Sequence, residues 1–204
     1  GQIITSPPIK RERKPFDLPP RNDRMSRVFS YLLLTRGIDK DVLFEFVKNK
    51  MIYESADYHN AVFVGYDLNG IPHHAHKRGT VTSNSYKGNV AGSQLEFSFH
   101  WHGTSDKMFL FEAPIDMLSY ISMHKDNWQR HSYAASCSVS DRVLFQCLKD
   151  NPNIKNVFLC FDNDEAGQTA NKRIADKLNI QNEILIPTHK DWNEDLTLSE
   201  KGDE

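Results

Sequence analysis

Two apolar runs that end in acidic residues decide the fold: KMFLFE at residues 107–112 and NVFLCFDND at residues 156–164. A continuously apolar run is typical of a strand that is buried on both faces of a sheet. A helical pattern follows each run, at residues 114–124 and at residues 166–178, where small and apolar residues recur every four positions. Strands that alternate with helices predict an α/β domain with a mostly parallel sheet and helices on both of its faces.

Further elements extend this pattern in both directions. A weaker strand is predicted near residues 133–135 and is followed by a helix over about 140–148, and a strand at 183–187 closes the series. Upstream, the apolar face of residues 28–34 predicts a helix that Gly37 stops, and Asp39 is placed to cap a second helix. The run at 61–66, followed by the turn residues Asn69 and Gly70, predicts a β-hairpin. We therefore expect a small helical and β-hairpin subdomain before the parallel sheet.

The composition narrows the class of protein. The chain has 204 residues, 25% of them charged, with a net charge of -2. These values exclude a highly charged disordered chain and a uniformly basic nucleic-acid coat protein. No apolar run approaches the ~18–20 residues that a membrane-spanning helix needs. Three widely spaced cysteines form neither a disulfide framework nor a zinc ribbon, so we expect a cytoplasmic protein without membrane partners.

The chain divides into three predicted parts. Residues 1–21 hold five of the nine prolines and a basic cluster at residues 10–14, which predicts an arm or linker. This arm is either a solvated tether or a nucleic-acid contact. Residues 22–104 would form the first subdomain and residues 105–204 the α/β domain. The first residue is not Met, and we expect the chain to be a fragment of something longer.

Acidic residues follow the predicted strands at one edge of the sheet, where such sheets bind their ligands. Glu112 ends the first run, Asp162 and Asp164 end the second, and KDWNED at residues 190–195 follows the last strand. Carboxylates two positions apart share a face and can converge on one Mg²⁺, which favours oxygen ligands. The alternative is that these acids cap helices, as Asp164 and Asp116 are placed to do.

The same residues resemble the Toprim domain shared by DnaG-type primases and topoisomerases. EAPIDMLS at 112–119 resembles its first motif, and DNDEAG at 162–167 resembles its Asp-x-Asp motif in the form found in primases. Lys190-Asp191 with Asp195-Leu196 resembles the region after the last core strand of primases. The upstream helices and hairpin are similar to the subdomain that precedes Toprim in primases. The arrangement is most like the primase-like Toprim proteins of conjugative and mobile elements.

This resemblance implies a metal-dependent nucleotidyltransferase that synthesises primers on single-stranded DNA from nucleoside triphosphates, with a helicase or relaxase of the same element as a further partner. It implies that Asp162 and Asp164 coordinate Mg²⁺ or Mn²⁺, and that Glu112 is a ligand or a general acid/base. Asp191 or Asp195 would help to hold a second ion. Asp116 would either support the ligands or cap its helix.

Basic residues are expected to bind the phosphates of nucleotide or DNA. Residues 68–95 contain no Asp or Glu but hold Lys77, Arg78 and Lys87, and Lys190 lies among the acids at the sheet edge. The alternative is a pair of ordinary polar loops. The five histidines at positions 73, 74, 76, 100 and 102 have no cysteine near them in the sequence. We expect them to be exposed strand residues rather than zinc ligands.

Two other functions fit the same features. The first is a Toprim nuclease that cleaves phosphodiesters with similar metals. The second is a non-catalytic DNA-binding accessory module of a mobile-element protein. A topoisomerase is disfavoured because the chain has no room for a separate tyrosine-bearing domain.

Overall fold

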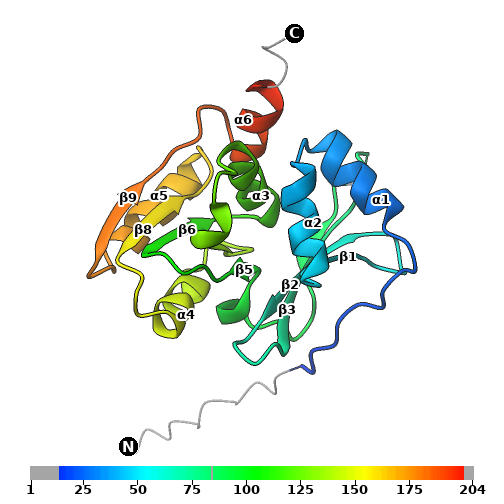
Figure 1. Ribbon diagram of the computed structural model, residues 1–204, viewed down its shortest axis with the longest axis horizontal. Coiled ribbons are helices and arrows are strands. Elements are labelled where there is room, and N and C mark those ends of the chain that lie inside the picture. Colours follow the sequence, from blue (N-terminus) through cyan, green and yellow to red (C-terminus); the bar gives the residue numbers. More distant parts are fainter. Residues whose placement is uncertain (1–13, 84, 200–204) are drawn as a thin grey trace, which may run out of the picture.

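The computed structural model describes residues 14–83 and 85–199, which form two sheets that lie side by side (Figure 1). The first sheet is antiparallel, in the order β1 (Ile52–Glu54), β2 (Ala61–Tyr66), β3 (Pro72–Arg78), β4 (Lys87–Asn89). The second has the order β5 (His100–Trp101), β7 (Ser132–Ala135), β6 (Lys107–Phe111), β8 (Asn156–Cys160), β9 (Gln181–Ile184). Its strands are parallel except β5, so the predicted mostly parallel α/β class is confirmed.

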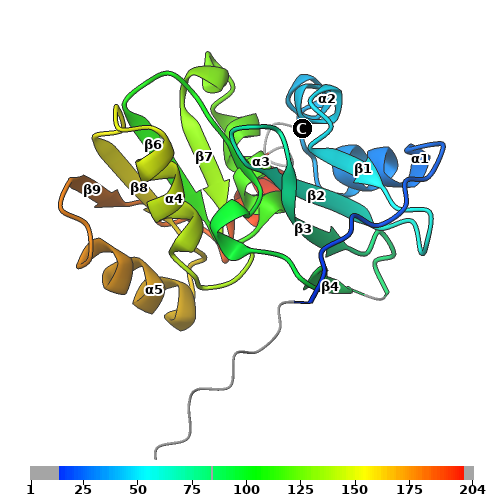
Figure 2. The same ribbon diagram turned by 90° about the horizontal axis from the view of Figure 1, so that it is seen from below.

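Helices cover both faces of the parallel sheet, as Figure 2 shows. They are α3 (Pro114–Met123), α4 (Arg142–Asp150), α5 (Glu165–Ala175) and α6 (Trp192–Ser199). Alternation along β6 sends Phe109 and Phe111 into the core beneath α3 and α6, and sends Met108 and Leu110 into the core beneath α4 and α5. The continuously apolar sequence of β6 follows from this burial on two sides.

The sequence misplaces the last strand and misses the last helix. The apolar run at 183–187 was expected to be a strand, whereas β9 begins at Gln181 and ends at Ile184. This strand lies at the sheet edge, where alternate side chains face solvent, so polar residues belong to it and the apolar pattern does not mark its limits. Helix α6 occupies the segment that the sequence marks only as an acidic cluster.

The first subdomain begins with a helix in two parts, α1 (Ser26–Phe29) and a π-helical turn η1 (Ser30–Thr35), which ends at Gly37 with φ +66°. Asp39 caps α2 (Lys40–Lys48) by accepting hydrogen bonds from the backbone N–H groups of Asp41 and Val42. The predicted hairpin is confirmed as β2 and β3. The short strands β1 and β4 extend it to a four-stranded sheet.

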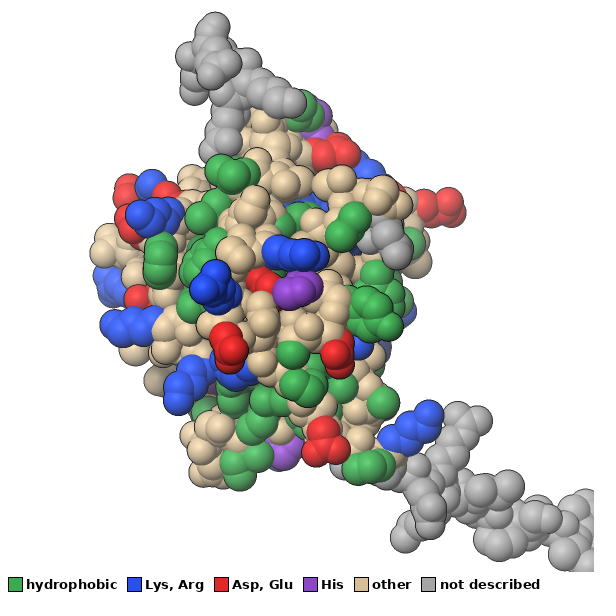
Figure 3. Space-filling model, turned by 90° about the vertical axis from the view of Figure 1, so that its right-hand side faces the viewer, with side chains coloured by type: hydrophobic (Ala, Val, Ile, Leu, Met, Phe, Trp, Pro, Cys, Tyr) green, Lys and Arg blue, Asp and Glu red, His purple; other side chains and the backbone are tan. Residues whose placement is uncertain are grey.

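Glu54, at the end of β1, holds the start of the first helix. Its Oε2 accepts hydrogen bonds from the backbone N–H groups of Arg27 and Val28, and its Oε1 accepts one from Asn22 and lies 2.6 Å from His59 Nδ1. Burial alone would raise the pKa of Glu54, but these bonds outweigh it and lower the pKa. The face of the molecule on the side of α1 and β1 carries Lys and Arg side chains beside a histidine (Figure 3).

The two sheets meet through an aromatic group that we name the junction cluster: Phe46, Phe63, Phe99, Trp101 and Trp128. The Phe46 ring stacks on Trp128 at 5.2 Å between centroids and lies 5.3 Å from Phe99. Phe99 also contacts Phe63 of β2 at 5.4 Å. Since its members come from both subdomains, the core is continuous across the junction.

Strand β2 also passes close to the segment that connects the two sheets, at Gly65. The backbone oxygen of Phe97, in the 3₁₀ turn η2 (Leu95–Phe97), lies 1.6 Å from where a Cβ on Gly65 would stand. A side chain at this position would displace one of the two segments.

Part of the predicted arm packs on the first sheet. Phe16 and Leu18 contact its buried residues, and the Tyr53 hydroxyl donates to the Pro19 carbonyl at 2.6 Å. The basic cluster at residues 10–14 lies, apart from Lys14, outside the described residues. Within the described part of the chain, no helix has the length and apolar character needed to cross a membrane.

Candidate active site

One pocket of about 190 Å³ collects the acidic residues at the carboxyl edge of the parallel sheet. The register pairs Phe111 with Cys160, so β6 and β8 end level and the residues after them, Glu112 and Asp162, reach the same pocket. Asp116 enters from the first turn of α3, and Asp191 enters from the start of α6. We name Glu112, Asp116, Asp162 and Asp191 the acid wall. The sequence predicted that these acids would meet at one edge, and the structure brings them together.

The carboxylates of the acid wall repel one another. Burial raises the pKa of Asp162 to about 7, with the charges of Glu112, Asp191 and Asp164 adding to the shift. Burial, and then Asp164, raise the pKa of Glu112. Burial, followed by the charges of Asp162 and Asp191, raises the pKa of Asp116 well above its usual value. Three carboxyl groups with raised pKa values, in a pocket that a fourth carboxyl group also lines, are the arrangement that a bound cation relieves.

The donor atoms fit a hard divalent cation. Asp162 Oδ1 is buried and has no hydrogen-bond partner within residues 14–83 and 85–199, so it presents a lone pair that a metal ion would satisfy. Among the described residues, no three carboxylates have oxygens within 4.8 Å of one another. One ion would therefore be held directly by two carboxylates at most, with water or phosphate oxygens completing its shell. Mg²⁺ is bound in proteins in this way.

Two predicted ligands do not line the pocket. Asp164 is exposed, and its Oδ1 caps α5 by accepting the Gly167 N–H at 2.7 Å, as the capping alternative expects. Asp195 uses both carboxylate oxygens on the loop before α6, where it accepts hydrogen bonds from the backbone N–H groups of Thr188 and His189. Asp195 therefore shapes the loop that carries Asp191.

A basic wall faces the acids from the first subdomain. It consists of Arg36, Arg78 and Lys87, and Lys190 adds a further positive charge from the acidic side. Arg78 and Lys87 are paired directly across β3 and β4. Lys77 points to the opposite face of β3, where its Nζ lies 5.4 Å from the Tyr86 ring centroid. Of the predicted phosphate-binding residues, Lys77 is the one that the structure leaves out of this pocket.

A hydrogen-bond network joins the two walls through Asn193 and Arg36. The Arg36 guanidinium donates to Asn193 Oδ1 at 3.1 Å, and Asn193 Nδ2 donates to the Arg36 carbonyl and to Ser119 Oγ. The Asn193 N–H donates to Asp116 Oδ1 at 3.3 Å. Sequence reasoning missed both residues, because 157 positions separate them and Asn193 is an amide among the acids of the cluster at 190–195.

The expectation that the histidines are exposed is wrong for three of them. His74, His76 and His100 are buried, since β3 lies between two strands and packs against η2, and β5 packs beside the junction cluster. Burial lowers the pKa of His74 to about 3, so its ring is neutral at physiological pH. His76 lines the candidate site beside Arg78.

Comparisons with known proteins agree with this architecture. Residues 30–105 match a family described as a protein of unknown function, DUF3991, and residues 109–196 match the Toprim-like family. An uncharacterized protein of Bacillus anthracis, from plasmid pXO2, is 26% identical over 163 residues, which cover 74% of this chain and 47% of that protein. The chain thus spans about half the length of this curated relative.

Two solved structures have the same fold. The primase fragment of the bacteriophage T7 primase-helicase has a TM-score of 0.61 and 20% identity, over 78% of this chain and 66% of that chain. A DnaG primase catalytic domain bound to single-stranded DNA has a TM-score of 0.55 and 13% identity, over 87% and 69% of the two chains. The chain therefore contains a Toprim-like domain at residues 109–196 and has, across both of its sheets, the fold of a DnaG-type primase catalytic core.

Proposed function

We propose that this chain is the catalytic core of a primase-like nucleotidyltransferase, which uses Mg²⁺ or Mn²⁺ to synthesise primers on single-stranded DNA from nucleoside triphosphates. The observation that supports this proposal is the opposition of the acid and basic walls across one pocket. A triphosphate bound with a divalent cation presents both charges at once, so it matches carboxylates on one side and guanidinium or ammonium groups on the other.

In this proposal Asp162 is the principal metal ligand, together with Glu112 or Asp191. Asp164 Oδ2 accepts no hydrogen bond among the described residues, so it would be available to an ion bound outside the pocket lining. Asp195 would act on a second ion indirectly, by fixing the loop of Asp191. Bound divalent ions would neutralise phosphate charge and stabilise the attacking and leaving oxygens of nucleotidyl transfer.

The remaining roles follow from position. Arg78, Lys87 and Lys190 would contact the phosphates. Arg36, which donates a hydrogen bond to Asn193, would hold the basic wall at a fixed distance from the acid wall. The raised pKa of Glu112 suits a group that accepts a proton from an attacking hydroxyl, if it is not a ligand. Asp116 is buried and bound by the Asn193 N–H, which supports a positioning role beneath Asp162.

The test compares two activities of the purified chain on single-stranded DNA with Mn²⁺: incorporation of labelled nucleotides and cleavage of a labelled strand. We expect incorporation by the wild type and none by Asp162→Asn. Asp176→Asn, an exposed acid after α5, is the matched control and should retain activity. Cleavage without incorporation would instead establish the nuclease function. Metal-independent DNA binding with neither activity would establish the accessory-module function.

The proposed partners are single-stranded DNA, nucleoside triphosphates and a helicase or relaxase of the same mobile element, all in the bacterial cytoplasm. The plasmid origin of the Bacillus anthracis relative supports the mobile-element context. The likeness in fold to a primase fragment from a primase-helicase supports a helicase as a partner, in cis or in trans.

A further inference from the structure

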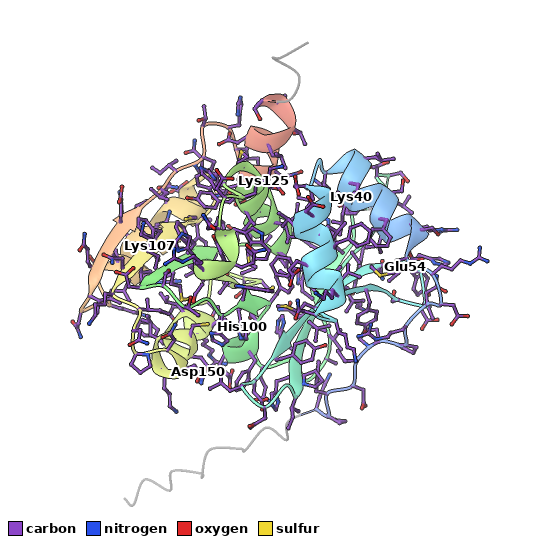
Figure 4. All side chains as sticks on the ribbon, viewed as in Figure 1. Lys40, Glu54, His100, Lys107, Lys125 and Asp150 are labelled. Carbon is purple, nitrogen blue, oxygen red and sulfur yellow. The ribbon has the colours of Figure 1, made fainter. Side chains whose placement is uncertain are left out.

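A second group of metal-ligating side chains lies away from the candidate active site, between β5 and α4. The ligand atoms of His100, His102 and Cys147 all lie within 4.8 Å of one another. Asp150 lies outside this group of three, but its Oδ2 is 4.0 Å from His102 Nε2. Figure 4 labels His100, in β5, and Asp150, at the end of α4, at neighbouring places in the view. None of the four lines the pocket of the acid wall.

We propose that His100, His102 and Cys147 form a zinc site that fastens the edge strand β5 to α4, with Asp150 moving toward the ion as the fourth ligand. Two nitrogens, one sulfur and one carboxylate oxygen make a four-ligand set from the residue types that Zn²⁺ prefers in tetrahedral sites. This set differs from the all-oxygen acid wall, which suits Mg²⁺ or Mn²⁺. The two sites would therefore select different metals.

The backbone places these ligands on facing surfaces. His100 and His102 are two positions apart along an extended segment, so their side chains project to the same side. Cys147 and Asp150 are three positions apart on α4 and share one helix face. The centroids of the two imidazole rings lie 4.7 Å apart and the ring planes make an angle of 74°. The rings therefore meet edge to face and are not stacked on each other.

Hydrogen bonds outside the group orient its members. His100 Nδ1 lies 2.6 Å from the Ser98 carbonyl and donates to it, which leaves Nε2 unprotonated with its lone pair available. A metal-bound histidine commonly donates its other ring N–H to a carbonyl or carboxylate in this way. Asp150 Oδ1 accepts a hydrogen bond from Gln146 Nε2 at 2.8 Å, which leaves Oδ2 turned toward His102.

The charge state of the group also favours a ligand. His100 and Cys147 are buried, and burial disfavours both an imidazolium and a thiolate there. A buried cluster of neutral polar groups contributes little to the core by packing alone. Coordination of Zn²⁺ would deprotonate the thiol and satisfy the imidazole and carboxylate lone pairs together. The site would lie next to Phe99 and Trp101, so the ion would stabilise the junction cluster rather than take part in the reaction.

The test is a Co²⁺ titration of the reduced, metal-stripped chain in excess Mg²⁺, which occupies the acid wall. We expect one equivalent of Co²⁺ to produce a thiolate-to-cobalt charge-transfer band that Zn²⁺ then abolishes. Cys147→Ser should lose the band, and His102→Asn should weaken Co²⁺ affinity at least tenfold. Cys137→Ser and Asp162→Asn are the matched controls and should retain it. No band in the wild type, or a full band in Cys147→Ser, would overturn the proposal.

Thermal unfolding gives a second measurement, which does not depend on the buried Cys147→Ser variant and so remains usable if that variant fails to fold. Zn²⁺ at about 100-fold above its Kd should raise the Tm of the wild type by about 5–10 °C. His102 is partly exposed, so His102→Asn should fold and show a much smaller rise. His124→Asn, a histidine at the end of α3, is its control and should respond as the wild type does. An equal rise in His102→Asn would contradict the zinc site.

Discussion

Asp162→Asn should make the metal-free protein more stable at neutral pH, although it removes the principal proposed ligand. The folded-state pKa of Asp162 is about 7, against about 3.9 in an unfolded chain. At about 1.4 kcal/mol per pH unit, this difference corresponds to about 4 kcal/mol of destabilisation above pH 7. Asp162 retains some solvent contact, and screening reduces the expectation to about 2 kcal/mol.

The sign gives a distinctive pH profile. Between about pH 4 and pH 7 the folded state binds a proton at Asp162 that the unfolded state lacks, so wild-type stability falls as the pH rises through this window. The asparagine variant lacks this titration, and its profile should be flatter. Burying the asparagine amide changes the free energy of unfolding by the same amount at every pH. The difference between the two slopes of this free energy against pH therefore reports only the titration of Asp162.

Urea unfolding in EDTA, at half-unit steps from pH 4.5 to pH 8, measures both slopes. Added Mn²⁺ at pH 7.5 should then stabilise the wild type and leave the variant unchanged, which reverses their order. Asp176→Asn is the control and should follow the wild type throughout. Parallel pH profiles of wild type and Asp162→Asn, or equal stabilisation of both by Mn²⁺, would refute the assignment of Asp162.

Three further outcomes are expected. Arg78→Ala/Lys87→Ala should reduce the salt-dependence slope of single-stranded DNA binding by about 0.7 per lost phosphate contact, measured by fluorescence anisotropy, whereas Lys77→Ala should leave it nearly unchanged. Glu112→Gln should lower nucleotide incorporation about 10²–10⁴-fold with an unchanged Tm; a lower Tm with intact turnover would mark Glu112 as structural. Glu54→Gln should cost about 2–3 kcal/mol at pH 7 by urea unfolding, because buried hydrogen bonds to a charged group are lost. Since the folded-state pKa of Glu54 is lowered, its contribution is present above about pH 4.3 and disappears as the pH falls further.

The strands and helices of the Toprim-like domain could be predicted where burial is complete. The run that became β6 is apolar on both sides because both faces are covered, and Asp39 marks the start of α2 through a local side-chain bond. The edge strand β9 could not be placed, because solvent on one side breaks its apolar pattern. Strands of three residues, such as β1 and β4, are too short for any periodicity to appear.

The candidate site could be predicted where its residues belong to a local pattern, as do the acids after the strands and Arg78 and Lys87 in the acid-free stretch. Glu112 and Asp162 follow apolar strands, and the geometry of parallel sheets brings such strand ends together. Arg36 and Asn193 depend on how the two subdomains pack, and no local pattern encodes that. The same limit applies to Cys147, which meets His100 and His102 only because α4 folds back beside β5. Residues on one element can be paired by spacing, but residues on different elements need the fold.

The junction cluster has a consequence for how this protein can be divided. Phe46 and Phe63 belong to the segment that matches one family, and Trp128 belongs to the segment that matches the other. Either segment expressed alone would present aromatic rings to water and would lose one wall of the pocket. The two segments therefore form one unit of folding. We expect an exchange of both segments together to preserve the pocket, whereas a breakpoint near residue 105 would expose the aromatic rings of each half.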